Sequence, residues 1–164
     1  MLFRKSPVCG VATFTWMRGK MTTDDTYQSH LDDVATSILT NDFNLFAANY
    51  DLPFLQVTGA AQGHVTTLAG LAEIFDGFVL TVALQKVTSV LMLVDFSEMV
   101  TPELIIGTHF THLLVGATRL CQPILCQKTL VRYGSVWRSA SAALRVGPLF
   151  WPGRPAGKHQ QKDA

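Results

Sequence analysis

The 164-residue chain has few charges, few cysteines and no long hydrophobic run. Charged residues make up 15% of it, against roughly 25% in an average domain, which indicates that much of its surface is hidden in a pocket or against a partner. Apolar runs stay shorter than the roughly 18 residues that a membrane-spanning helix needs, so we expect no membrane partner. The three cysteines form no disulfide or zinc pattern. They predict free thiols in a reducing compartment, and we expect a cytoplasmic protein.

Basic residues form no cluster in the sequence. Residues 21–85 contain eight acidic residues and no Lys or Arg, whereas residues 86–150 contain six basic residues and three acidic ones. Nucleic-acid binding requires a basic stripe, so the sequence predicts no nucleic-acid partner. A phosphate-binding loop, a nucleophile elbow and a cluster of metal ligands are also missing from the sequence. We therefore expect neither a cofactor nor a metal.

Apolar residues, at 48% of the chain, are abundant and gather in long extended segments. Four segments rich in β-branched and aromatic residues, 87–99, 103–115, 122–133 and 135–144, are separated by short breaks. Each exceeds the usual strand length of about five or six residues. They predict four long antiparallel strands.

Three parts of these strands, at 90–94, 104–106 and 124–125, are apolar on both faces. A sheet with one face in water alternates polar and apolar residues, so this pattern indicates that both faces are covered. A homodimer formed through the sheet face is the simplest cover.

The region before the strands shows helical spacing. Tyr27, Leu31, Val34 and Ile38 recur at helical intervals after Thr22, a residue type that caps helices. They predict an amphipathic first helix with one buried face.

Two more helices and a hairpin follow in the sequence. The spacing predicts a short helix over 43–50, a hairpin with strands at 54–58 and 64–67, and a third helix over 68–85. Helices followed by a long antiparallel meander are typical of the α+β class.

The composition of the two ends differs from that of the middle. Residues 1–21 carry no acidic residue and no clear period, and residues 153–164 are polar. We expect a single domain over 22–152, preceded by a leader that is disordered or not native and followed by a disordered tail.

Three segments carry a resemblance to a known superfamily: TNDFNLFAANYDLPFLQVT, HVTTLAGLAEIFDGF and LVRYGSVWRSASA. Together with the order of helices and strands, they resemble the nuclear-transport-factor-2-like superfamily, which includes ketosteroid isomerases and polyketide cyclases. The resemblance implies a cone-shaped, curved antiparallel sheet wrapped around the N-terminal helices, a cystatin-like α+β roll. It also implies an apolar pocket between the sheet and the helices.

The resemblance does not extend to the residues of steroid isomerisation. That chemistry uses a carboxylate base with a tyrosine and a protonated acid as oxyanion donors. The isomerase pattern puts the tyrosine position near Val34, the base near Val57 or Thr58 and the second acid near Thr129. None of these has the required side chain, so the steroid-isomerase mechanism is disfavoured.

The segment GTHFTHLL contains the best candidates for chemistry, His109 and His112. Residues three apart on a strand point to opposite faces, so we expect one histidine in the pocket and the other on the outer face. We favour His109 as a catalytic acid or base, with Asp95 or Thr111 to orient it.

The alternation of side chains along the strand at 123–133 indicates further pocket residues. Lys128 and Arg132 share one face of the strand at 123–133, and we expect that face to point outward, which leaves Gln127 and Thr129 inside. The expected pocket-lining residues are Tyr27, Phe46, Tyr50, Phe54, Phe75, Phe78, Thr111, His112, Gln127, Thr129 and Trp137.

Two functions remain open on this basis. The first is a pocket protein for a small apolar or amphipathic ligand, acting as a cofactor-independent acid–base lyase, isomerase or cyclase. The second is a non-catalytic homodimerisation or ligand-sensing module. Small subunits of ring-hydroxylating oxygenases share the implied fold, and this is a third option without specific support in the sequence.

Overall fold

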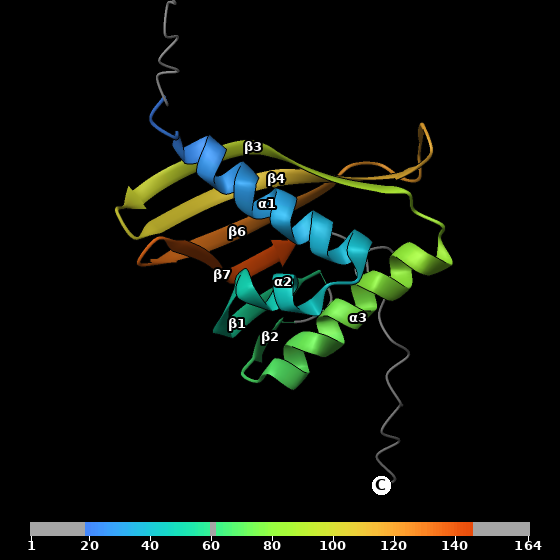
Figure 1. Ribbon diagram of the computed structural model, residues 1–164, viewed down its shortest axis with the longest axis horizontal. Coiled ribbons are helices and arrows are strands. Elements are labelled where there is room, and N and C mark those ends of the chain that lie inside the picture. Colours follow the sequence, from blue (N-terminus) through green and yellow to red (C-terminus); the bar gives the residue numbers. More distant parts are fainter. Residues whose placement is uncertain (1–18, 60–61, 146–164) are drawn as a thin grey trace, which may run out of the picture.

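The computed structural model describes residues 19–59 and 62–145 (Figure 1). The elements in chain order are α1 (Thr23–Thr40), α2 (Phe43–Ala48), β1 (Tyr50–Thr58), β2 (Gln62–Val65), α3 (Leu68–Leu84), β3 (Ser89–Thr101), β4 (Leu104–Val115), β5 (Thr118–Arg119), β6 (Ile124–Tyr133) and β7 (Val136–Leu144). The expected tail at 153–164, and all but the last three residues of the expected leader at 1–21, lie outside the described residues. Within the described ranges, no helix has both the length and the apolar character needed to cross a membrane.

The strands form one sheet in the order β2-β1-β7-β6-β4-β3, with β5 paired to β4. The α+β class and the curved sheet around N-terminal helices are confirmed, and the four long strands lie within two residues of their predicted bounds. One pairing differs from the expected antiparallel pattern, because β1 runs parallel to β7. β1 also begins at Tyr50, four residues before the expected strand. Tyr50 therefore enters the sheet and does not end the second helix.

α1 lies across the sheet and supplies one wall of the core (Figure 1). Thr22 and Asp25 form a capping box at its amino end, in which each side chain accepts a hydrogen bond from the other residue's backbone N–H. The predicted stripe at Tyr27, Leu31 and Val34 is at most 1% exposed. The amphipathic pattern thus determines which face of α1 meets the sheet.

Polar side chains of α1 bind the edge strand β3. The Gln28 side chain donates to the Met92 carbonyl at 2.7 Å and accepts from the Val94 N–H at 2.9 Å. Ser97 and Asp24 also form a side-chain hydrogen bond. These contacts hold α1 in a fixed register along β3, beside the irregular pairing between Val94 and Phe96.

A close approach between α1 and β4 requires a glycine. A Cβ atom at Gly107 would meet the Tyr27 ring at 2.5 Å, which is closer than carbon atoms can pack. The absence of a side chain at position 107 therefore lets the tyrosine lie flat on the sheet.

An aromatic cluster closes the core beside α2 and α3. Phe46 stacks on Tyr50 at a centroid distance of 4.4 Å and packs against Phe75 at 4.9 Å. Tyr50 in turn meets Phe54 edge-on at 4.9 Å. Ring pairs of this kind stabilise a fold beyond the area they bury, so this cluster is a rigid wall.

We predict that Gly107→Ala lowers the free energy of unfolding by about 1–3 kcal/mol, because Tyr27 must move to admit the methyl group. Chemical denaturation measures this change. Gly63→Ala is the matched control, since nothing lies within 4 Å of a Cβ atom there. An equal effect of the two substitutions would contradict the close packing of Tyr27.

Candidate functional site

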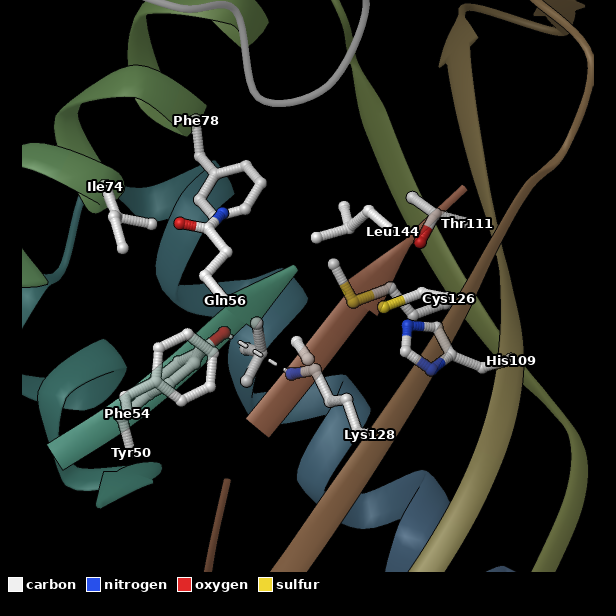
Figure 2. Close-up of a pocket in the computed structure, with 13 residues that line it drawn as sticks. Tyr50, Phe54, Gln56, Ile74, Phe78, His109, Thr111, Cys126, Lys128 and Leu144 are labelled. Atoms are coloured by element: carbon white, nitrogen blue, oxygen red, sulfur yellow. Dashed lines mark hydrogen bonds between the residues drawn. The ribbon is translucent and has the colours of Figure 1, made fainter. Parts of the chain in front are cut away.

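A cavity of about 30 Å³ lies between the inner face of the sheet, α1 and α3 (Figure 2). Its lining residues are Val34, Tyr50, Phe54, Gln56, Ile74, Phe78, Met92, His109, Thr111, Cys126, Lys128, Ala142 and Leu144. All of them are buried except Gln56 on β1 and Ile74 on α3, which are half-buried. These two side chains therefore mark the side of the cavity nearest to solvent.

Lys128 is a buried lysine in the wall of this cavity. Its side chain is 4% exposed, and its Nζ donates to the Tyr50 hydroxyl at 3.3 Å (Figure 2). The same Nζ lies 3.5 Å from His30 Nε2. Among the described residues, no carboxylate forms an ion pair with it. Burial lowers the pKa of Lys128 to about 8, because the cation is poorly solvated there.

His30 continues this network behind Lys128. Its Nε2 lies 3.2 Å from the Ser139 hydroxyl, on β7. Burial, followed by the charge of Lys128, lowers the pKa of His30 well below its ordinary value. The ring is therefore neutral, and it presents Nε2 to Lys128 as a hydrogen-bond acceptor.

His109 and Tyr27 form a second polar pair, and His109 lies on the same inner face of the sheet as Lys128, on the neighbouring strand β4. The Tyr27 hydroxyl lies 3.0 Å from His109 Nδ1, and the imidazole points into the cavity (Figure 2). Burial, with a smaller contribution from the charge of Lys128, lowers the pKa of His109 to about 3, so the ring is neutral. Burial likewise raises the pKa of Tyr27, which keeps its proton. When that proton is donated to Nδ1, the N–H of the neutral ring lies on Nε2.

Cys126 lies two residues before Lys128 on the same face of β6. Burial raises the pKa of its thiol to about 11. A thiol in this state is a poor nucleophile, because only the thiolate reacts readily. Lys128 is thus the one lining group whose pKa lies near physiological pH.

Solved structures of other proteins share this arrangement of helices and sheet, although no family model and no curated protein matches the sequence. A domain of unknown function from Nostoc punctiforme, with a cystatin-like fold, aligns at a TM-score of 0.59 and 12% identity over 77% of this chain and 78% of that chain. A protein of unknown function from Shewanella oneidensis, described as NTF-2 like, aligns at 0.54 and 5% identity over 74% and 98%. The chain has the nuclear-transport-factor-2-like fold. A hexachlorocyclohexane dehydrochlorinase from Novosphingobium barchaimii shares it at a TM-score of 0.53 and 12% identity, over 73% and 83%.

Within this nuclear-transport-factor-2-like fold, five of the residues expected at the site line the cavity: His109, Tyr50, Phe54, Phe78 and Thr111. Tyr27 lies behind His109, and Phe46 and Phe75 belong to the aromatic cluster. The other expected pocket residues, His112, Gln127, Thr129 and Trp137, are not among the lining residues. His109 and His112 do point to opposite faces of β4, as their spacing predicts.

The predicted orientation of β6 is wrong. Lys128 points inward with Cys126 and Leu130, whereas Gln127 is exposed and Thr129 is only half-buried. The prediction assumed that a lysine points to water, and this lysine does not. The apolar residues Ile124, Cys126 and Leu130 share its parity and were the signal for the true inner face.

Asp95 does not approach His109. It is exposed at the irregular pairing of β3, where it accepts a hydrogen bond from the Thr108 hydroxyl at 3.2 Å. Val94 instead lies opposite His109, and Asp95, as the next residue of the strand, points to the outer face. The group that orients His109 is Tyr27. The sequence predicted Tyr27 as a pocket-lining residue but did not predict its contact with His109.

The described ranges contain no group of three or more His, Cys, Asp or Glu side chains arranged to hold a metal ion. The polar groups that line the cavity are the amine of Lys128, the phenol of Tyr50, the imidazole of His109, the thiol of Cys126, the hydroxyl of Thr111 and the amide of Gln56. This set can transfer protons and donate hydrogen bonds to an oxygen atom.

We predict that Lys128→Met raises the free energy of unfolding at pH 7 by about 3 kcal/mol, since the pKa of about 8 lies below the ordinary value of 10.5. The folded wild type binds fewer protons than the unfolded chain between these values, so its stability rises from pH 8 to pH 10.5. The advantage of the variant is full below pH 8 and disappears above pH 10.5. Denaturation of both proteins across this range measures the difference.

The neighbouring groups Tyr27, His30, Tyr50, His109 and Cys126 titrate in both proteins. The charge of Lys128 shifts the pKa values of His30, His109 and Cys126, so the measured difference includes their response to its removal. Lys86→Met is the control, because Lys86 is exposed and its replacement changes stability by no more than about 0.5 kcal/mol. A Lys128→Met protein less stable than the wild type at pH 7 would show that the buried cation stabilises the fold.

Proposed function

We propose that the protein binds a short, mostly apolar compound with a carbonyl group and transfers a proton on it without a cofactor. One observation carries this proposal. A lysine amine that has no carboxylate partner among the described residues and a neutral imidazole both line one apolar cavity. The reaction class is proton abstraction from the carbon next to the carbonyl, as in lyases and isomerases.

Lys128 is the proposed base. A general base is most effective when its pKa lies near the operating pH, and the pKa of Lys128 is about 8. About a tenth of the amine is unprotonated at pH 7 with this pKa, against less than about a thousandth for an ordinary lysine. The protonated form that results remains beside Tyr50 and can stabilise the negative charge of an enolate.

His109 is the proposed hydrogen-bond donor to the carbonyl oxygen. Its pKa of about 3 makes it a weak base, so the role first expected for it is transferred to Lys128. A neutral imidazole can polarise a carbonyl through its N–H. Tyr27 supports this role by holding Nδ1, which keeps the N–H on Nε2.

The size of the cavity limits the ligand. An engineered cavity of about 150 Å³ accommodates benzene, and a water molecule needs about 10–15 Å³. A cavity of about 30 Å³ accepts a compound of a few heavy atoms unless its walls move. A hexachlorocyclohexane dehydrochlorinase has the same fold, which supports an enzymatic use of the cavity described here. The compound in its name, hexachlorocyclohexane, is larger than a compound of a few heavy atoms.

We predict that the protein accelerates deuterium exchange at the α carbon of acetone, acetaldehyde or propanal in D₂O, as measured by NMR. The rate should rise with pH through about 8, because the unprotonated amine is the active form. Lys128→Met should abolish the effect, and His109→Phe should reduce it by about 10²-fold or more. Lys86→Met, which alters an exposed lysine, should match the wild type. Exchange that survives in Lys128→Met refutes the assignment of the base.

A second function, homodimerisation through the outer face of the sheet, is supported by a different observation. Leu91, Leu93 and Phe96 on β3 are 44%, 49% and 55% exposed, and Leu93 lies opposite the half-buried Phe110 of β4. An apolar strip that pairs with itself across a twofold axis gives an isologous contact between two copies. We propose a second copy of this chain as the partner.

We predict a dimer by size-exclusion chromatography with light scattering, and a monomer after Leu93→Asp and Phe96→Asp are combined. The two carboxylates would lie within the contact and repel one another. Leu68→Asp is the control, because Leu68 is 59% exposed on α3, away from this strip. A wild-type monomer at high protein concentration would exclude this interface.

A further inference from the structure

We propose that the amine of Lys128 forms an imine with small aldehydes or ketones inside the cavity, so that the lysine bonds covalently to its substrate. This inference rests on the proposed function, because the same cavity must first admit a carbonyl compound. It goes further by assigning the amine the role of a nucleophile and by naming a covalent intermediate.

The geometry around Nζ suits a neutral amine. An unprotonated lysine has two N–H groups and one lone pair, and two acceptors lie beside it, the Tyr50 hydroxyl at 3.3 Å and His30 Nε2 at 3.5 Å. When the amine donates to both acceptors, its lone pair remains free. Lys128 lines the cavity, so a compound bound there lies beside the amine (Figure 2).

The surroundings of Lys128 contain nothing that would hold it as a permanent cation. No described carboxylate pairs with it, and its nearest neighbours include the Tyr50 ring, whose centroid lies 5.0 Å from Nζ. A buried lysine kept only for structure is normally paired with an acid. The lowered pKa agrees with this geometry, and desolvation of this kind activates lysines that form Schiff bases.

The imine forms in two steps, through a carbinolamine. The Nζ lone pair forms a bond to the carbonyl carbon while the C=O π electrons move to oxygen, and a proton passes from nitrogen to that oxygen. The C–O bond of this carbinolamine then breaks, the C=N bond forms, and the second amine proton leaves with the oxygen as water. His109 Nε2–H, on the neighbouring strand, can hydrogen-bond to the oxygen while it carries negative charge.

The imine is a second use of the same amine, because a nitrogen bonded to the carbonyl carbon no longer has the lone pair with which a base removes a proton. Small volume gives the site its selectivity, because a cavity of about 30 Å³ admits acetaldehyde more readily than benzaldehyde.

The test is reductive trapping on the wild-type, full-length protein. Acetaldehyde and cyanoborohydride at pH 7 should attach an ethyl group to Lys128, located by peptide mass spectrometry. We expect labelling of Lys128 to be at least about tenfold faster than labelling of the exposed Lys86, because more of its amine is unprotonated. Urea should remove the difference, and benzaldehyde should label Lys86 without labelling Lys128.

A parallel measurement separates this inference from the proposed function. The methyl signals of Thr111 and Leu144, which line the cavity, report whether acetaldehyde enters it. If these signals shift while Lys128 stays unmodified at pH 7 and at pH 9, the imine is refuted and ligand binding stands. If neither the signals nor Lys128 changes, both proposals fail. Equal labelling of Lys128 by benzaldehyde would refute a reaction confined to the cavity.

Discussion

The packing of α1 on the inner face of the sheet determines where the polar groups of the cavity lie. The helix brings Tyr27 to His109 and His30 to Lys128, and it contributes Val34 to the lining. Its position along the sheet depends on Gln28, whose amide binds the backbone of β3, and on Gly107, which lets Tyr27 lie close to β4. A shift of α1 by one turn would separate both histidines from their partners at once.

The polar network within this packing is unusual in having no acid. Buried cations are normally compensated by carboxylates, and here the partners of Lys128 are a phenol and a neutral imidazole. Such partners can accept hydrogen bonds but cannot neutralise a charge, so the fold itself disfavours the protonated lysine. The proposed function would account for this loss of stability, because functional sites commonly reduce the stability of a fold.

Much of the fold could be predicted from sequence, because the long strands and the helical stripes repeat over many residues. The stripe from Tyr27 to Ile38 and the four β segments are long, so each pattern is still recognised when one residue departs from it. The site depended on single residues, and there the prediction was less complete. One lysine at position 128 was assigned to solvent by its residue type, and this reversed the orientation of β6. Asp95 lies on the outer face because Val94 beside it points inward, and the pairing register that determines which residues of β3 face inward cannot be recognised in the sequence of one strand.

The two half-buried side chains of the cavity, Gln56 and Ile74, belong to β1 and α3, whereas Lys128 and His109 belong to β6 and β4. The side chains nearest to solvent and the side chains of the reactive wall therefore come from different parts of the chain. Substitutions at the first pair would alter the solvent side of the cavity, with the amine and the imidazole left in place. Under the proposed function, the choice of substrate and the chemistry therefore rest on different elements, and an engineer could vary the two independently.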